Sequence, residues 1–189
     1  MAKVYEFLAN GFEEIEALAP VDILRRGGVD IHTVSITGSE WVESAHGVTM
    51  KADLMFEDID PFEEVDMLLL PGGMPGASHL NEHAGLREAL IEHNALGKRI
   101  GAICAAPMVL GSLGILKGRR ATCYPGFDKY LDGAEYTAEL VTVDGNITTS
   151  KGPATVFMYG FYLLRQLTSE ANAEEVKNGM LINELAALH

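Results

Sequence analysis

The stretch VDMLLLPGG, residues 65–73, decides the fold class, because its apolar run ends abruptly at proline and glycine. A run that is apolar enough to be buried on both faces is typical of a central strand in a parallel sheet. Such sheets carry helices on both of their faces. The stretch therefore predicts an α/β domain.

Short apolar runs alternate with helical patterns through the rest of the chain. Further strands are expected at 3–9, 30–36, 99–103 and 121–124. Helices are expected at 13–26, 84–96, 105–113, 154–167 and 169–179, followed by a tail at 181–189. Two hairpins are predicted around the turns at 46–47 and 144–146. This alternation predicts a mostly parallel sheet, although Pro20 should kink or split the first helix.

The composition indicates one soluble globular domain over residues 1–189. Hydrophobic residues make up 48% of the chain, which is enough to bury a sizeable core. There are 27 acidic and 14 basic residues, and the resulting net charge of −13 repels phosphate backbones and anionic membranes. We therefore expect neither a nucleic-acid partner nor a membrane partner.

The expected compartment is the cytoplasm. No basic segment precedes the first apolar run, and no stretch approaches the ~18 apolar residues of a membrane span. Two cysteines cannot form a disulfide framework, and their spacing is not that of metal ligands. A cytoplasmic protein with reduced thiols is the natural expectation.

Three loops follow the carboxyl ends of predicted strands, which is where sheets of this kind bind ligands. They cover residues 10–14, 71–78 and 104–107. Cys104 opens the third loop, between the strand and the helix of RIGAICAAPMVLG (99–111). A residue at such a turn projects from the sheet edge, and a helix amino-terminus can lower a thiol pKa. The alternative is a buried structural cysteine, since cysteine is among the most buried residue types.

The glycine-rich loop at 71–76 shares that sheet edge. Its glycines let backbone N–H groups approach a ligand or an oxyanion closely. It matches neither of the common phosphate-binding patterns, GxxxxGK[ST] or GxGxxG, so a nucleotide site is not indicated. Taken alone, the loop is equally consistent with a tight connection.

Three glutamates open the first helix. Glu13 and Glu14 are explained by the helix dipole, which favours acidic residues in a first turn. Glu16 lies on the stretch expected to face inward. Burial there would keep its carboxyl protonated, so that it donates a hydrogen bond to a thiolate.

The histidines do not supply a base for Cys104, because the residue after the cysteine is Ala105 and no histidine is near it in sequence. His79 and His83 have i, i+4 spacing but no third ligand, so no metal site is expected. Surface or loop positions are expected for most of the histidines, which are His32, His46, His79, His83, His93 and His189.

Five motifs in this order resemble the ThiJ/PfpI family. They are EEIE (13–16), APVDILRR (19–26), LLPGG (69–73), AICAAP (102–107) and SKGPAT (150–155). The match runs over about residues 3–167, and its closest branch looks like that of the protein deglycases. The resemblance implies a flavodoxin-like three-layer sandwich of the class I glutamine amidotransferase type, in a homodimer.

The resemblance also implies the site. It places the reactive cysteine at Cys104, its carboxyl partner at Glu16, and the oxyanion-binding amides at Gly73 and Ala105. Protease members of the family have a histidine directly after the cysteine, where this chain has Ala105, so a Cys–His protease is not expected. The deglycase branch commonly has a histidine before a proline on a later strand, and Tyr124 stands there in this chain.

A tyrosine is a far weaker base than a histidine at neutral pH, with a reference pKa of about 10. Any activity that relies on that histidine is therefore in question here. The neighbouring Cys123 is either a second thiol at the site or a buried strand residue, and we favour the buried position.

Two functions follow from these residues. The leading hypothesis is a cofactor-free conversion of 2-oxoaldehydes, or of their early adducts on protein amines, to 2-hydroxy acids by Cys104. The alternative is a redox-sensing stress protein or chaperone that oxidises Cys104 without turnover. In the first case the partner is a small reactive aldehyde or a glycated amine.

Overall fold

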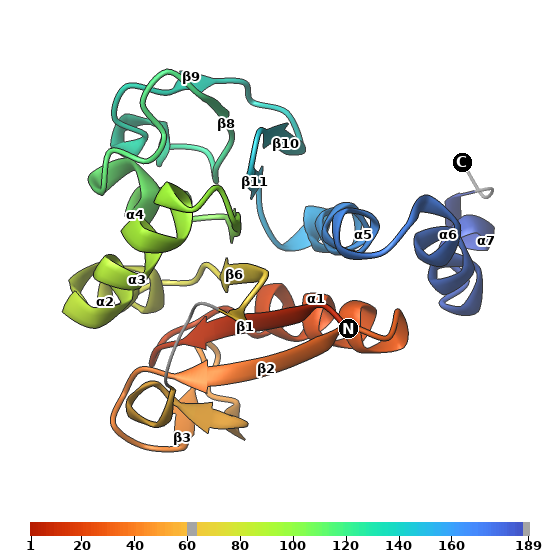
Figure 1. Cartoon of the computed structure of the whole chain (residues 1–189), viewed down its shortest axis with the longest axis horizontal. Helices are drawn as coiled ribbons and strands as arrows, with labels where there is room; N and C mark the ends of the chain where they lie inside the picture. Colours follow the sequence, from red (N-terminus) through yellow and green to blue (C-terminus); the bar gives the residue numbers. More distant parts are fainter. Residues whose placement is uncertain (60–63, 187–189) are drawn as a thin grey trace.

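A computed structural model describes residues 1–59 and 64–186 of the chain. Its centre is a seven-stranded sheet of order β10-β11-β7-β6-β1-β2-β5, shown in Figure 1. The β10–β11 pair is antiparallel, and the other neighbouring pairs are parallel. The strands are β1 (Lys3–Leu8), β2 (Asp30–Ser35), β5 (Leu54–Met55), β6 (Met67–Leu70), β7 (Arg99–Ile103), β10 (Val141–Asp144) and β11 (Ile147–Ser150).

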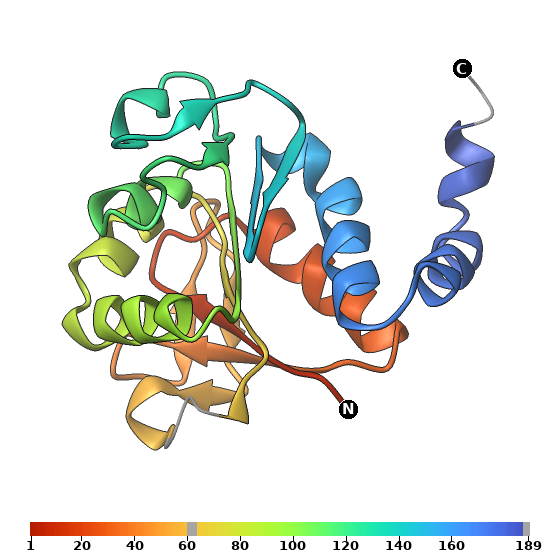
Figure 2. The ribbon, with the colours of Figure 1, turned by 45° about the horizontal axis from the view of Figure 1, so that its top comes forward.

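Helices cover both faces of this sheet, as Figure 2 shows, which confirms the predicted flavodoxin-like three-layer α/β fold. Helices α1 and α5 pack on one face, and α2, α3 and α4 pack on the other. Helices α6 and α7 continue outward beyond α5. The helices are α1 (Glu14–Arg26), α2 (Gly76–Glu82), α3 (Ala84–Ala95), α4 (Pro107–Ser112), α5 (Val156–Leu167), α6 (Glu170–Gly179) and α7 (Ile182–Ala186).

Strand β6 lies in the middle of the sheet and is buried along its whole length, as the run at 65–70 predicts. Its side chains alternate between two apolar cores. Leu68 and Leu70 join the core on the α2–α4 side, whereas Met67 and Leu69 join the core beneath α1 and α5. The two-sided burial of one strand therefore holds the three layers together.

Both predicted hairpins are present. Strands β3 (Trp41–Glu43) and β4 (Thr49–Lys51) form a separate antiparallel pair, and β10 with β11 closes one edge of the main sheet. The first hairpin is held beside α1, because the Ala45 N–H donates to the Phe12 carbonyl oxygen at 2.7 Å.

Four local predictions are corrected by the structure. Residues 76–78, expected in a loop, begin α2, because Gly76 packs so closely on Gly11 that a Cβ there would lie 2.6 Å from Gly11 C. That close approach gives no periodic signal in the sequence.

Pro20 does not split α1, which continues through it and packs along α5. Residues 182–186 form α7 instead of a tail, while 187–189 lie outside the described residues.

The strand expected at 121–124 is the fourth correction. Only Arg120–Ala121 (β8) is extended, and it pairs with β9 (Glu135–Tyr136) outside the main sheet. The chain leaves this pair because the Tyr124 N–H donates to the carbonyl oxygen of Cys104 at 2.8 Å. No helix within 1–59 and 64–186 is both long and apolar enough to cross a membrane.

Candidate active site

Cys104 lies in the tight turn between β7 and α4, in a conformation that is rare for a residue with a side chain. Its φ is 63°, in the left-handed region, which costs of order 1–3 kcal/mol for a non-glycine residue. The Cys104 N–H donates to Ser150 O at 2.9 Å, and its carbonyl accepts from Tyr124 N. The surrounding backbone thus fixes the strained turn and leaves the thiol partly exposed.

Glu16 lies in the first turn of α1 and is completely buried. Its Oε2 accepts a 3.0 Å hydrogen bond from the Gly72 N–H, while Oε1 has no hydrogen-bond partner among the described residues. Gly72 has no side chain to separate the two reactive groups. A Cβ at Gly72 would lie 2.6 Å from the Cys104 Cβ and would collide with Glu16 Oε2. The sequence thus brings the carboxyl and the thiol together across a glycine.

The loop after β6 and the start of α1 interlock. Glu13 caps the helix, because its Oε2 accepts from the Glu16 N–H at 2.7 Å. The Glu13 N–H in turn donates to Gly72 O at 3.0 Å. Gly73 has a φ of 87°, and a Cβ there would lie 2.6 Å from Gly11 O. Gly73 is therefore required both by its backbone conformation and by the close approach of the two loops.

Burial changes the protonation of both reactive groups. The pKa of Glu16 is raised to about 7, mainly because burial disfavours the charged carboxylate, with the Glu13 charge adding to the effect. The pKa of Cys104 is raised to about 12 by burial first and then by the neighbouring Glu16 carboxylate. The backbone N–H groups of Gly73 and Ala105 act in the opposite direction and lower the thiol pKa.

The prediction of a thiol pKa lowered by a helix amino-terminus is therefore wrong for the resting site. The loss of solvent and the adjacent Glu16 carboxylate raise the thiol pKa by more than the two backbone N–H groups lower it. The inward position and raised pKa expected for Glu16 are confirmed in direction. The structure brings Cys104, Glu16, Gly73 and Ala105 to one place, and their chemical roles stay a proposal.

The other acidic residues and histidines near the loops have structural partners. Glu14 Oε2 lies 2.9 Å from His46 Nδ1, and ligand atoms of Glu13, Glu14 and His46 lie within 4.8 Å of one another. Glu13 Oε2 accepts from the Glu16 N–H as the helix cap, so each of the three residues already has a partner within the protein. His79 contacts Asn10 O, and His83 accepts from Leu86 N. The expectation of no metal stays a prediction.

Cys123 and Tyr124 differ in exposure although they are adjacent. Cys123 is completely buried in the core on the α2–α4 side, which confirms the favoured interpretation. Tyr124 is half-exposed, with its ring 3.2 Å from the place of a Cβ on Gly152 and in edge contact with Phe127 at 6.5 Å. Tyr124 thus lies at the surface next to the Cys104 turn, and we call the segment 122–124 the rim.

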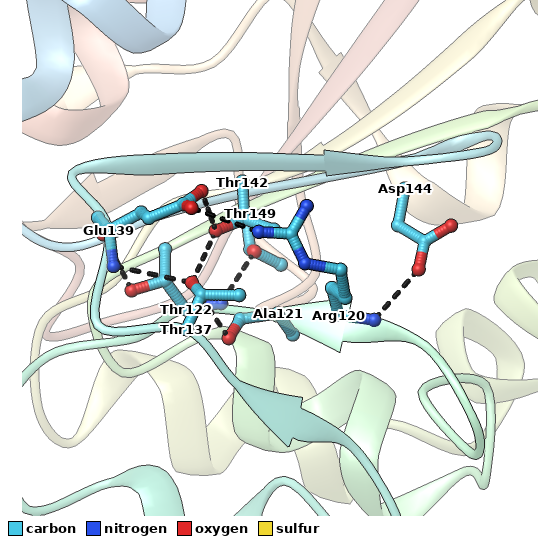
Figure 3. A network of polar contacts seen from close by, with 8 residues as sticks. All are labelled: Arg120, Ala121, Thr122, Thr137, Glu139, Thr142, Asp144 and Thr149. Carbon is cyan, nitrogen blue, oxygen red and sulfur yellow. Dashed lines mark hydrogen bonds and ion pairs between the residues drawn. The ribbon is translucent and has the colours of Figure 1, made fainter.

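A polar network, shown in Figure 3, anchors the segment that carries Tyr124. The Thr122 N–H donates to Thr149 Oγ1 at 2.9 Å, and the Thr122 hydroxyl donates to Glu139 O at 2.8 Å. Arg120 adds an exposed 2.9 Å ion pair with the Glu139 carboxylate. These bonds replace the regular strand pairing that was expected there, so the rim is held on the sheet edge.

Sequence reasoning missed two buried polar residues beneath the site. Glu6 lies on β1 and Tyr159 on α5, and each is at most 1% exposed. Glu6 Oε2 and the Tyr159 hydroxyl have no hydrogen-bond partner within the described residues. A signal was present for Glu6, because it is a carboxylate in the middle of an otherwise apolar strand.

Comparison with known proteins places this geometry in a family. The profile of the DJ-1/PfpI family matches residues 2–166. The chain belongs to the DJ-1/PfpI family. Protein DJ-1 homolog B of Arabidopsis thaliana is 36% identical over 95% of this chain, which spans only 41% of that longer protein. The Parkinson disease protein 7 homolog of Danio rerio is 34% identical, over 94% of this chain and 95% of that one.

Family members of known structure and a named enzyme extend the comparison. The deglycase PH1704 of Pyrococcus horikoshii is 35% identical, over 83% of this chain and 94% of that one. The oxidised DJ-1 of Toxoplasma gondii superposes with a TM-score of 0.91 at 35% identity, covering 96% of this chain and 98% of that one. The names of these two relatives are those of a deglycase and of a DJ-1 protein.

Proposed function

We propose that the protein converts 2-oxoaldehydes, or their early adducts on amines, to 2-hydroxy acids by covalent catalysis at Cys104. The observation that carries this proposal is the meeting of the Cys104 side chain with the buried Glu16 carboxyl across Gly72, next to the backbone of Gly73 and Ala105. That arrangement supplies a nucleophile, a proton carrier and an oxyanion site. The deglycase relatives support a reactive carbonyl or glycated amine as the substrate class.

Glu16 is the base that the resting thiol needs. With its pKa raised by burial to about 7, a useful fraction of Glu16 is ionised at neutral pH. A base whose pKa lies near the working pH combines availability with driving force for proton transfer. Glu16 takes the proton from the Cys104 thiol as the sulfur attacks. Its raised thiol pKa then makes Cys104 a strong nucleophile once that proton is removed.

The steps balance without an external oxidant or reductant. The Cys104 sulfur bonds to the aldehyde carbon, and the carbonyl electron pair moves to oxygen, where the Gly73 and Ala105 N–H groups stabilise it. Glu16 protonates that oxygen, removes the hydrogen of the former aldehyde carbon, and returns a proton to the adjacent carbon. The hydroxyl proton on the former aldehyde carbon passes to the former ketone oxygen, which leaves a thioester of the 2-hydroxy acid. Water then cleaves the thioester. The net change is addition of one water to the 2-oxoaldehyde, giving the 2-hydroxy acid and the free thiol.

Turnover of methylglyoxal by wild type, Cys104→Ser and Glu16→Gln tests the mechanism. We expect no measurable turnover for Cys104→Ser and a 10²- to 10⁴-fold lower kcat for Glu16→Gln, the usual range for loss of an acid–base group. Cys123→Ala serves as the matched thiol control and should keep the wild-type rate. Equal rates for wild type and Cys104→Ser would exclude the proposal.

A redox-sensing role without turnover is the second candidate, supported by the partly exposed Cys104 and by the oxidised state of the Toxoplasma relative. A peroxide would add oxygen to the thiolate, first as a sulfenic and then as a sulfinic acid, and would itself be reduced to water. Mild peroxide followed by peptide mass mapping separates the candidates. Two oxygens on Cys104, in a protein that never consumes methylglyoxal, would favour sensing.

We also propose a cytoplasmic homodimer, as the family resemblance implies. Ile15 and Leu18 on α1 are 50% and 41% exposed, so apolar surface next to the site is available for such a contact. Sedimentation equilibrium gives the oligomeric state directly, and a monomer at micromolar concentration would contradict the dimer.

A further inference from the structure

The face of the sheet beneath α1 and α5 holds a group of buried acids. Within the described residues, four buried side-chain polar atoms have no hydrogen-bond partner, and three of them belong to Glu6, Glu16 and Tyr159. Glu6 comes from β1, Glu16 from α1 and Tyr159 from α5, so the three residues are distant in sequence. Their gathering at one side of the sheet is a property of the tertiary fold.

The strand register shows how these groups share one face. Glu6 is paired with Leu69, and Leu69 with Gly101, so the three residues form one row across β1, β6 and β7. Leu69 faces the core under α1 and α5, which contains Tyr159. The Tyr159 hydroxyl occupies the place that a Cβ on Gly101 would need. The absence of a side chain at Gly101 therefore admits the hydroxyl to the sheet surface.

This row lies directly below the reactive thiol. Gly101 lies on β7 and precedes Cys104, which directly follows that strand, by three residues, at most about 10 Å at the usual rise of ~3.3 Å per residue. Glu16 occupies the upper end of that interval, beside Cys104 and Gly72, and its Oε1 is free of any bond in the described structure. The charge of Glu16 acts on the Tyr159 hydroxyl, so the carboxyl and the tyrosine lie near enough to influence each other.

The protonation of these buried groups depends on the charges of their neighbours. The pKa of Tyr159 is raised by burial and then by the charges of Glu6 and Glu16, and the pKa of Glu6 is raised by burial. On Glu16 the acting groups are Cys104, Glu13 and the Gly72 amide. Buried polar groups in proteins are normally hydrogen-bonded, and ordered water serves that purpose where protein partners are missing.

We propose that ordered water in this compartment joins the Glu6 carboxyl and the Tyr159 hydroxyl to the free oxygen of Glu16. Glu6 and Tyr159 are then positioning residues for the Cys104–Glu16 pair. The water chain donates a hydrogen bond to the Glu16 carboxylate, which favours the state in which Cys104 holds the proton. The inference rests on the proposed function only in taking Cys104 and Glu16 as the reacting pair.

The pH dependence of Cys104 alkylation by iodoacetamide tests this coupling. In wild type, the alkylation rate should rise with pH to a first plateau as the Cys104–Glu16 pair loses the first of its two protons. The remaining proton is then shared between the two groups, so a fraction of the molecules carries the Cys104 thiolate. Glu6→Leu and Tyr159→Phe should each move that midpoint upward by about 0.5–1 pH unit, since the carboxylate loses a donor. They should also raise the plateau rate severalfold, because the remaining proton shifts from Cys104 to Glu16.

Three further variants separate coupling from a structural defect. Glu6→Gln retains a donor and an acceptor, so its midpoint should equal that of wild type. The Glu6→Leu/Tyr159→Phe double variant should shift no further than the larger single one, because both residues act through the same water. His93→Leu removes the fourth unpartnered atom, on α3 across the sheet, and should leave the midpoint unchanged.

Each failure has a distinct meaning. If the first step is absent in wild type, or persists in Glu16→Gln, the reacting pair itself is wrong and the proposed function fails. The first rise of the alkylation rate can depend on Glu16 while Glu6→Leu leaves the midpoint of that rise in place and changes only the stability of the fold. That result overturns the inference alone and leaves the proposed function standing. A high-resolution crystal structure with no water within hydrogen-bond distance of Glu6 Oε2 and the Tyr159 hydroxyl would also overturn it.

Discussion

The two cysteines of this chain have the same raised pKa in opposite surroundings. Burial raises the pKa of each thiol to about 12. Cys104 is partly exposed at a strained turn beside Glu16 and two backbone amides, whereas Cys123 is enclosed in an apolar core. A thiol pKa alone therefore does not mark the reactive residue. What differs is whether a base can take the proton and whether donors can hold the charge that forms next.

The largest expected difference between the two regions is in thiol labelling. In native protein at pH 7.5, iodoacetamide should modify Cys104 faster than Cys123, because Cys104 is partly exposed and lies beside a carboxylate that can take its proton. The completely buried Cys123 reacts only in molecules that have unfolded, and these are a fraction of about 10⁻³ or less. Time-resolved peptide mass mapping measures both rates. In denaturant the two rates should converge, and a native ratio near one would show that the comparison is wrong.

The next prediction concerns the glycine loop beside Cys104. Gly73→Ala should reduce the free energy of unfolding by about 4 kcal/mol, from the left-handed φ and the collision with the start of α1 together. Gly28→Ala is the matched control, because Gly28 has a similar φ of 77° but open space around its Cβ position. It should cost only about 1 kcal/mol.

Urea denaturation of both glycine variants measures these losses. If Gly28→Ala costs as much as Gly73→Ala, the interlock of the two loops contributes nothing. A Gly73→Ala protein as stable as wild type would show that the two loops do not approach each other as closely as described.

The raised pKa of Glu16 makes stability depend on pH below and around neutrality, whereas the raised pKa of Cys123 does so only above about pH 9. The folded protein keeps the Glu16 proton up to about pH 7, whereas the unfolded chain releases it near 4.5. The stability from this group is complete below about pH 4.5 and is lost as the pH rises to about 7. At 1.36 kcal/mol per unit, the loss is about 3 kcal/mol.

Glu16→Gln isolates this contribution from the other titrating groups. The difference in unfolding free energy between wild type and the variant should change by about 3 kcal/mol between pH 4.5 and 7.5, with wild type relatively weaker at the higher pH. Urea titrations at several pH values measure it. A difference that stays constant with pH would mean that Glu16 is not desolvated in solution.

The sequence predicts the three layers of the fold and the edge of the sheet at which the candidate site lies, because both depend on local sequence patterns. An apolar run at 65–70 and a cysteine between a strand and a helix are enough to locate β6 and the turn at Cys104. The raised thiol pKa is not predictable in this way, since it depends on how deeply Glu16 and Cys104 are buried together. Helix α2 and the position of Tyr159 depend on close approach to Gly11 and Gly101, and contacts of that kind leave no periodic signal.

The smallest effects should have opposite signs at the two cysteines. Cys104→Gly should be more stable than Cys104→Ala by about 1 kcal/mol, because glycine adopts a φ of 63° without strain. Cys123 is not in the left-handed region, so Cys123→Gly should be less stable than Cys123→Ala by a similar amount. Under the proposed function both Cys104 variants should lose turnover, and the strain would then be retained at a cost in stability because the reaction requires a side chain there. Thermal unfolding of the four variants gives both differences, and two differences of the same sign would show that the turn at Cys104 is relaxed.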